Sequence, residues 1–410
     1  MKRVFLLFAV TRVVLFLVAA APPLVEPCER FRVAVDGPPG VFEEQIVPWS
    51  KSDTGERYNL TQIRWLDAFT HMDARYYLSI GAFSYRLGED GAIPKEAGFF
   101  PGYPLAVRVV ARGLEIVSGV AHRPDPVRRT LWLVAALLVA QGALLLAALS
   151  LQRLVAAIAG EDVGVAAAAV LLLNPFAFFG SAMLSESLFL FLSIECLRRA
   201  HRREFALAAV FGAVAALTRP IGAALVVPLL AASFERRSDR RETIGDACAF
   251  ALVPAGAALV PAWHGIALGA PFAYAEIQRQ YGHGAFPDFR GVVELLGIFG
   301  PTPLDTARNV IQVVGLVAAV ASLVALRNRA REGRFPWFLV VWGATALAVP
   351  LLSGHVISLP RYVFGAFPVF IGAVYLLPRS RGALVAVGAV AMILQVAAFM
   401  VFAKAWPLFI

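Results

Sequence analysis

The feature that most constrains this chain is a series of apolar runs, each near the length of about 20 residues that a helix needs to cross a bilayer core. The runs recur along nearly all of the 410 residues, of which 59% are hydrophobic and 16% charged, with a mean hydropathy of +0.71. A soluble domain of this size has too little interior to bury so much apolar surface. We therefore predict an all-α integral membrane protein with many spanning helices, and we exclude a cytosolic enzyme.

The first run has features of a secretory signal, because a basic start precedes it and three alanines at 19–21 end it. Arg12 lies in its middle, where a signal peptide rarely carries a charge, so we predict a retained first helix. The pattern predicts about eleven spanning helices, at residues 4–21, 131–151, 163–179, 183–199, 205–218, 221–234, 245–265, 309–326, 335–352, 362–377 and 383–402.

The distribution of charge orients these helices. The formal net charge is +9, and the basic residues fall in short clusters between the apolar runs, which indicates membrane topology rather than nucleic-acid binding. With the clusters on the cytoplasmic side, the opposite side receives a long first loop, 22–130, and the loops 267–308 and 353–361. The clusters are Lys2-Arg3, Arg198-Arg199 with Arg202-Arg203, Arg236-Arg237 with Arg240-Arg241, Arg327 to Arg334, and Arg379 with Arg381.

The segment 103–120 allows two interpretations. Arg108, Arg112 and Glu115 are three or four residues apart and so share one helical face. We predict a helix lying on the membrane surface, whereas a spanning helix here would invert part of the topology.

The concentration of polar residues on the outer side, without an internal repeat, favours an enzyme with an extracytoplasmic site over a transporter. That side holds no ATP or nucleotide sugar, and the sequence has neither a Walker loop nor a dinucleotide fingerprint. An activated donor must then be carried by a lipid. The three cysteines, Cys28, Cys196 and Cys248, are too few and too scattered to indicate a disulfide framework or a zinc site.

Five short elements carry most of the candidate chemistry. In chain order they are Trp65-Leu66-Asp67 with Asp73-Ala74-Arg75-Tyr76-Tyr77-Leu78-Ser79-Ile80, Phe99-Phe100-Pro101-Gly102-Tyr103-Pro104, Asn174-Pro175 leading into Ser185-Glu186-Ser187, Thr218-Arg219-Pro220-Ile221-Gly222, and Leu359-Pro360-Arg361-Tyr362. This order resembles the PIG-V-like mannosyltransferases, a branch of the GT-C glycosyltransferases that includes GPI mannosyltransferase 2 and many bacterial relatives.

The resemblance implies one GT-C-type transmembrane domain over 1–410, with the catalytic aspartate in the first loop, 22–130. It also implies a polyprenyl-phosphate-mannose donor, a site on the outer face and an inverting transfer. The chain departs from the family at Met72, because the family usually has a tryptophan before its aspartate. The longer match that follows Asp73 makes Asp73 the counterpart, with Asp67 as the alternative.

The chemistry limits what such a site must contain. A sugar phosphate has a good leaving group and needs no general acid, so one base suffices for an in-line, inverting attack. Asp73 is the candidate base. Asp67 is a second carboxylate that orients the site or caps a helix, and without a third ligand nearby the pair does not favour a divalent cation, so no cofactor is predicted. Arg219 and Arg361 are the candidate ligands of the donor phosphate, because the arginine fork suits phosphate oxygens; interfacial arginines are the alternative.

Five further residues are weaker, supporting candidates. Arg12 is predicted to be a buried partner of a carboxylate or a backbone carbonyl. Glu186 starts a helix, where an acid suits the dipole, or orients the catalytic centre. Tyr77 and Tyr103 stack on a sugar or, as the favoured interpretation, lie in an aromatic belt at the membrane interface. Asn174 belongs to the Asn-Pro element.

We therefore expect a mannosyltransferase that transfers mannose from polyprenyl-phosphate-mannose to a glycolipid or glycan acceptor. The alternatives are another lipid-linked sugar, protein O-glycosylation, and, from another class, a transporter or flippase for lipid-linked sugar. Membrane lipids are further expected partners, and nucleic acid is not. A composition rich in Ala, Val, Leu and Arg fits a GC-rich bacterium, so we predict a bacterial plasma membrane protein with its active site on the extracytoplasmic side.

Overall fold

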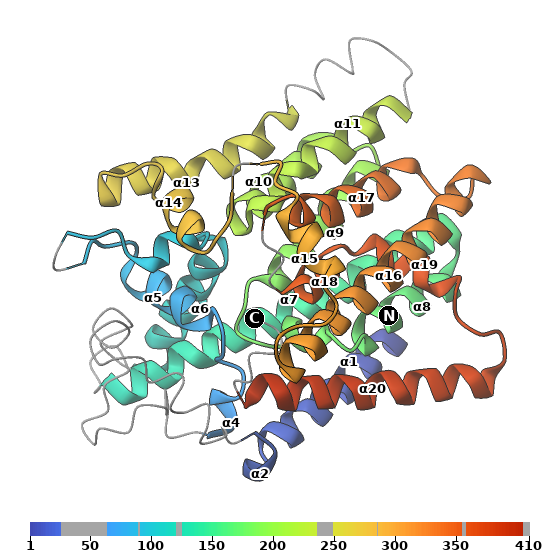
Figure 1. Cartoon of the computed structure of the whole chain (residues 1–410), viewed down its shortest axis with the longest axis horizontal. Helices are drawn as coiled ribbons and strands as arrows, with labels where there is room; N and C mark the ends of the chain where they lie inside the picture. The colour runs from blue at the N-terminus through green and yellow to red at the C-terminus, as the bar shows by residue number, and fades with distance from the viewer. Residues whose placement is uncertain are drawn as a thin grey trace.

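The computed structural model describes residues 1–25, 64–88, 91–119, 125–235, 249–284, 286–354 and 358–404. Within these ranges the regular structure is helical and no strand forms (Figure 1). The predicted all-α fold is confirmed.

The helices differ greatly in length. The first half of the chain forms α1 (Lys2–Ala19), α2 (Pro22–Val25), α4 (Arg64–Asp67), α5 (Ala74–Phe83), the 3-10 helix η1 (Lys95–Gly98), α6 (Gly102–Ser118), α7 (Asp125–Ala159), α8 (Glu161–Leu173), η3 (Ala177–Gly180) and α9 (Glu186–His201). The second half forms α10 (Phe205–Thr218), η4 (Pro220–Leu225), α11 (Val226–Glu235), α13 (Leu252–Leu268), α14 (Ala273–Gln280), α15 (Arg290–Leu296), α16 (Pro303–Arg331), α17 (Trp337–Leu351), α18 (Leu359–Gly365), α19 (Pro368–Val374) and α20 (Arg381–Ala403).

Three of the described helices are long and apolar enough to cross a membrane by themselves: α7 over Thr130–Ala159, α16 and α20. The pair α13 and α14 adds a fourth if the two form one span, although they are bent by 96° at a short break. The helices α10 and α17 and the segment Pro220–Glu235 are apolar but shorter. Each of the predicted segments overlaps a helix, but their number as membrane spans is not confirmed.

Several predicted spans are broken where the chain carries proline. The run 163–179 forms α8 only as far as Leu173, because Asn174 precedes Pro175 and takes an extended backbone instead of continuing the helix. The run 362–377 divides into α18 and α19, since Pro368 begins a new helix. The break after α8 lies next to two of the candidate residues, Asn174 and Glu186.

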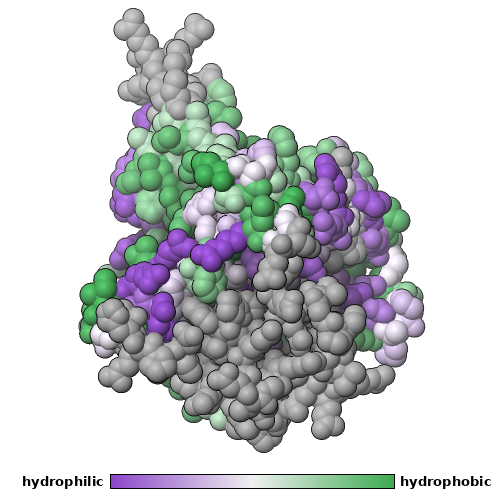
Figure 2. All heavy atoms as spheres, turned by 90° about the vertical axis from the view of Figure 1, so that its left-hand side faces the viewer, coloured by the Kyte–Doolittle hydropathy of each residue, from purple (hydrophilic) through white to green (hydrophobic). Residues whose placement is uncertain are grey.

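The outermost helices expose apolar side chains. Only 11% of the most apolar window of α20 and 22% of that of α16 is buried within the molecule, so these faces suit contact with lipid tails. Figure 2 shows the side that carries α13, α14 and α5, where hydrophobic surface lies above a band of hydrophilic residues. The core, in contrast, is built on α7, α8, α9 and α10, which pack on one another along their lengths.

The helix α6 directs two of its charged side chains, Glu115 and Arg108, toward neighbouring helices. Glu115 is 1% exposed and accepts hydrogen bonds from Arg112, at 2.7 Å, and from the indole of Trp132 on α7, at 2.9 Å. Arg108 donates to the carbonyls of α5 at Gly81 and Ile80. Glu115 and Arg108 on the predicted shared face therefore pack against α7 and α5, while the side chain of Arg112 is 55% exposed. The position of α6 relative to the membrane stays a prediction.

Candidate active site

Four charged side chains from distant parts of the sequence meet in one cluster. Nη1 of Arg361 lies 2.7 Å from Oδ2 of Asp73, and Nη2 of the same arginine lies 2.6 Å from Oε1 of Glu186. Nη1 of Arg219 lies 2.7 Å from that same Glu186 oxygen. The predicted base and the two predicted phosphate ligands are thus brought together, with Glu186 as the bridge between the arginines.

The exposure of these side chains rises across the charged cluster. The side chain of Glu186 is 1% exposed, that of Arg361 is 10%, that of Arg219 is 14% and that of Asp73 is 24%. Oε2 of Glu186 has no hydrogen-bond partner in the part of the chain that the structure describes. Asp73 is therefore the member most open to a substrate, and Glu186 is the internal anchor.

The position of Arg219 follows from a helix break. The helix α10 ends just before it, its own backbone is extended (φ −149°, ψ 145°), and Pro220 then starts η4. The return is tight, because a Cβ atom on Gly222 would lie 2.5 Å from the backbone of α10. Gly102 packs on the same helix end, where its Cβ would lie 2.5 Å from the hydroxyl oxygen of Thr218. Both motif glycines therefore let neighbouring backbones approach closely enough to hold Arg219 in place.

Two turns with left-handed backbone present Asp73 and Arg361. Met72 has φ +62° and Ser358 has φ +59°, a conformation that costs a residue with a side chain about 1–2 kcal/mol. Asp73 follows the first turn as the N-cap of α5, but its side chain does not cap the helix, so the carboxylate is available to Arg361. Strain of this kind concentrates at functional sites.

Glu186 lies at a helix start and contacts both arginines, while its role in orienting a catalytic centre stays a prediction. It is the first residue of α9, where the helix dipole favours a carboxylate, and it also orients both arginines. The preceding Ser185 places its Oγ 2.9 Å from the hydroxyl of Tyr77 and accepts from Nη1 of Arg219 at 3.4 Å. The sequence reasoning missed Ser185 as a contact of the cluster, although it stands inside the Ser-Glu-Ser element.

The interfacial aromatic belt predicted for Tyr77 and Tyr103 is wrong. Tyr77 is 6% exposed and Tyr103 is fully buried, and their rings meet edge to face with centroids 5.4 Å apart. The hydroxyl of Tyr103 donates to the carbonyl of Ala136 on α7 at 2.8 Å. Both hydroxyls bond to protein groups, that of Tyr77 to Ser185 and that of Tyr103 to Ala136, as buried tyrosines require.

The carbonyl of Asp67 and the side chain of Asn174 form hydrogen bonds with residues that are neighbours in the sequence. Asp67 ends the short helix α4, and its carbonyl accepts a hydrogen bond from Thr70 at 2.7 Å. The side chain of Asn174 accepts from the backbone N–H of Phe176 at 2.8 Å, which turns the chain after α8. Asp73, rather than Asp67, is the carboxylate joined to Arg361, while the catalytic roles stay predictions.

The partners predicted for Arg12 are wrong. Its guanidinium is 4% exposed and donates to the hydroxyl of Ser181, to Oε1 of Gln395 at 3.5 Å, and through Nε to the hydroxyl of Thr11 at 3.3 Å. These acceptors are hydroxyls and an amide, whereas a carboxylate or a backbone carbonyl is the expected partner. Sequence reasoning missed Gln395, whose signal is a polar side chain in an otherwise apolar helix.

Aromatic side chains flank the arginines. The guanidinium of Arg219 lies over the ring of Tyr362 at 5.8 Å. Tyr274 of α14 packs edge to face against Phe100, with centroids 5.1 Å apart, and is close enough to Arg219 to interact electrostatically. A small cavity next to the two arginines is lined by Phe189 and Ala346, among other residues. No motif draws attention to Tyr274, because it lies in the loop region 267–308.

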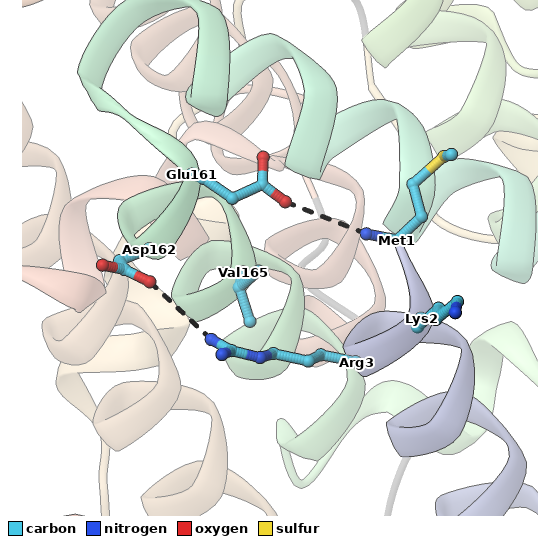
Figure 3. A pocket seen from close by; sticks show the side chains of 6 residues that line it. All are labelled: Met1, Lys2, Arg3, Glu161, Asp162 and Val165. Atoms are coloured by element: carbon cyan, nitrogen blue, oxygen red, sulfur yellow. Dashed lines mark ion pairs between the residues drawn. The ribbon is translucent and has the colours of Figure 1, made fainter.

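A second hollow lies at the N-terminus of α1, away from the candidate residues. Figure 3 shows the terminal amine of Met1 facing Glu161 and the guanidinium of Arg3 facing Asp162. The nitrogen and oxygen atoms of each pair are 3.8 Å apart. All four groups are largely exposed, so these pairs contribute little to stability. They tie the start of α1 to the start of α8.

The cluster contains an accessible carboxylate that can accept a proton. The two arginines beside it can bind an anionic phosphate. Within the described ranges, no three His, Cys, Asp or Glu side chains come close enough together to hold a metal ion. This finding does not test whether the protein uses a cofactor, so the absence of a cofactor stays a prediction.

Comparison with known proteins bears on this site. Residues 45–229 match the family model described as mannosyltransferase (PIG-V). The predicted resemblance to the PIG-V mannosyltransferases is confirmed. The matched region contains Asp73, Glu186 and Arg219, while Arg361 lies beyond it. The match supports glycosyltransferase activity. No curated protein matches the chain.

Two solved structures from Archaeoglobus fulgidus are similar at low level. The oligosaccharyltransferase AglB in complex with an inhibitory peptide and a dolichol-phosphate is 13% identical, with a TM-score of 0.45 over 82% of this chain and 51% of that one. The oligosaccharyltransferase in its apo form is also 13% identical, with a TM-score of 0.46 over 98% of this chain and 56% of that one. This chain therefore spans about half the length of those proteins.

Proposed function

We propose that this chain is an inverting mannosyltransferase that moves mannose from polyprenyl-phosphate-mannose to a hydroxyl of a glycolipid or glycan. The observation that carries the proposal is the convergence of Asp73, Arg219 and Arg361 around Glu186. Transfer from a sugar phosphate needs a base for the acceptor and positive charge for the phosphate, and the charged cluster contains both. The family match supports the class of reaction.

In this reaction the acceptor oxygen attacks the anomeric carbon from the side opposite the phosphate. The bond from that carbon to the phosphate oxygen breaks, and its electron pair stays on the polyprenyl phosphate. Asp73 takes the proton from the acceptor hydroxyl. Arg219 and Arg361 offset the negative charge that the phosphate gains, and their shared contact with one Glu186 oxygen, at 2.7 and 2.6 Å, keeps them close enough for one phosphate to bind both.

The donor should be tested on the purified protein. Supplied with polyprenyl phosphate carrying radiolabelled mannose and no acceptor, the wild type should release mannose slowly, because water can replace the acceptor. Asp73→Asn should release it far more slowly, and polyprenyl-phosphate-glucose should compete poorly. A transporter or flippase would leave the donor intact, so a wild-type protein that binds the lipid but never cleaves it would overturn the proposal.

The outward orientation is part of the proposal and has its own support. The helix α9 carries the charged cluster at its start and Arg198, Arg199 and Arg202 at or just beyond its end, about 22 Å away at 1.5 Å per residue. Basic residues gather on the cytoplasmic side, which leaves the cluster outside.

In a cysteine-free background, Arg279→Cys on α14 should therefore react with an impermeant thiol reagent added to intact cells. Arg202→Cys, at the opposite end of α9, should react only after the membrane is opened. The reverse pattern would place the site inside and remove the argument for a lipid-borne donor.

A further inference from the structure

The segment 174–185 between α8 and α9 is irregular and yet buried. Apart from the short turn of η3 it has no helix, and all of its residues from Ala177 to Ser185 are buried. An irregular backbone inside a membrane bundle needs partners for its polar groups, because neither water nor a regular helix supplies them. The segment leads directly into Glu186, the anchor of the charged cluster.

Two glutamine side chains on two other helices supply partners for some of these backbone groups. Nε2 of Gln395, on α20, donates to the carbonyl of Leu172 at 3.1 Å and to that of Asn174 at 2.8 Å. Gln141, on α7, donates to the carbonyl of Ser181 at 3.1 Å. These contacts occupy carbonyls at the end of α8 and in the middle of the segment.

Arg12 joins this set together from α1. It donates to the hydroxyl of Ser181 and to Oε1 of Gln395, so it couples the segment to α20. Figure 1 shows α1 and α20 crossing at one side of the bundle, and the two helices are in contact. No carboxylate neutralises Arg12 within the described residues, so burying its charge costs free energy. The hydrogen bonds that Arg12 donates to Ser181 and Gln395 offset part of this cost.

The segment also touches the site at two further points. The N–H of Met183 donates to the carbonyl of Phe69 at 2.9 Å, in the loop just before Asp73. The ring of Phe179 lies 6.0 Å from the guanidinium carbon of Arg361. A shift of the segment would therefore move Glu186 and disturb its neighbours Asp73 and Arg361.

We propose that Arg12 and Gln395 are positioning residues for the transfer reaction: they hold the segment 174–185 from behind and so fix Glu186 against the two arginines. This inference rests on the proposed function for its effect on rate. Its structural part does not depend on any substrate.

The structural part is tested by hydrogen–deuterium exchange on the purified protein without substrate. Gln395→Leu should speed deuterium uptake several-fold in peptides that cover 174–186. The matched control is Gln312→Leu, which also replaces a buried glutamine in a long apolar helix, α16, and should leave that uptake unchanged. Arg12→Lys, which keeps the charge without the fork, should act in the same direction as Gln395→Leu. Uptake at 174–186 equal to wild type in both variants would overturn the inference.

The functional part is tested by a double-mutant cycle on mannose release from polyprenyl-phosphate-mannose. Gln395→Leu should lower the rate constant about tenfold or more with little change in KM, since small displacements of catalytic groups reduce turnover. In a Glu186→Gln background the same change should have little further effect, because it acts through Glu186. Equal losses in both backgrounds would indicate a general structural role and overturn the proposal. A wild type inactive on this donor would instead contradict the proposed function, while the exchange result would still decide what holds the segment.

Discussion

Both ends of α9 carry buried pairs of arginine and glutamate, and the two differ in where the partners come from. Near the C-terminal end, Glu195 is paired with Arg198 at 2.6 Å and Arg199 at 3.5 Å, three and four residues along the same helix. At the N-terminal end, Glu186 is paired with Arg219 and with Arg361, which come from the break after α10 and from α18. The first set forms whenever the helix forms, whereas the second exists only once distant segments have assembled.

Under the proposed function, this difference separates structural from functional charge. Local pairs three or four residues apart stabilise a helix by a few tenths of a kcal/mol. Within the described residues, the long-range set leaves one oxygen of Glu186 without a hydrogen-bond partner and leaves Asp73 partly exposed, as the proposed binding of a donor and an acceptor requires. Matched substitutions at the two ends of α9 therefore test whether the N-terminal cluster is the site.

The largest expected effect is that of Asp73→Asn. The amide keeps the shape of the carboxylate but cannot accept a proton, so turnover should fall by at least about 100-fold while donor binding persists. Asp67→Asn should have a milder effect. Rates of mannose transfer or release for the two purified variants measure this. An inactive Asp67→Asn together with an active Asp73→Asn would move the base to the Trp65-Leu66-Asp67 element.

Next come the arginines. Arg219→Ala and Arg361→Ala should each weaken binding of polyprenyl-phosphate-mannose by about 2–5 kcal/mol, the usual effect of truncating one partner of a desolvated charge pair. Lysine should restore little, because a point charge cannot copy the two-pronged contact. Equilibrium binding of the labelled donor measures the loss. Arg198→Ala, at the other end of α9, is the control and should bind the donor as the wild type does; equal losses in all three would mean that the cluster does not bind the phosphate.

The sequence predicts the helices better than the contacts between them. The helix α10 is predicted at its observed bounds, because Glu204 and Arg219-Pro220 enclose an uninterrupted apolar run. The run 163–179 is predicted as one span, but its helix ends at Leu173. Hydropathy cannot indicate this break, because the carbonyls of Leu172 and Asn174 accept hydrogen bonds from Gln395, which is distant in the sequence. The meeting of Asp73 with Arg361 follows only from the fold.

The partners of Arg12 illustrate the same limit. A carboxylate is the expected neighbour of a buried arginine, but the amide that binds it is Gln395, 383 positions away in the chain. Tyr77 and Tyr103 are assigned to the interface from the sequence for a related reason. A tyrosine next to a predicted membrane span looks the same in the sequence whether its side chain faces lipid headgroups or the protein core. Periodicity identifies the helix, and only packing decides which of its faces is internal.

A smaller effect should come from the two glutamates of α9. Glu186→Gln keeps a hydrogen-bond acceptor but removes the charge that holds Arg219 and Arg361 together, so kcat should fall about tenfold to a hundredfold with KM for the donor little changed. Glu195→Gln should leave kcat unaltered and lower only the melting temperature. Steady-state kinetics and thermal unfolding of both variants give the answer. Equal kinetics in the two variants would remove the distinction between the ends of α9.

The smallest expected effect concerns Glu96, a buried glutamate in the first loop, 22–130. Among the described residues no arginine forms a salt bridge with it. It is 6% exposed and accepts a hydrogen bond from the hydroxyl of Ser79 at 3.0 Å. Burial raises the pKa of Glu96 above its ordinary value, although the hydrogen bonds it accepts and the charge of Arg75 act in the opposite direction. The folded protein therefore binds this proton more tightly than the unfolded chain does.

Stability contributed by such a group is complete below the pKa of the unfolded glutamate and is lost as the pH rises through the higher pKa of the folded state. Glu96→Gln removes that dependence, so its melting temperature should exceed that of the wild type by a few degrees at pH 8, and the gain should vanish near pH 4. Thermal unfolding between these limits measures it, with the exposed Glu276→Gln as the control. Parallel profiles for wild type and Glu96→Gln would mean that Glu96 is as well stabilised in its ionised form as the glutamates that arginines hold on α9.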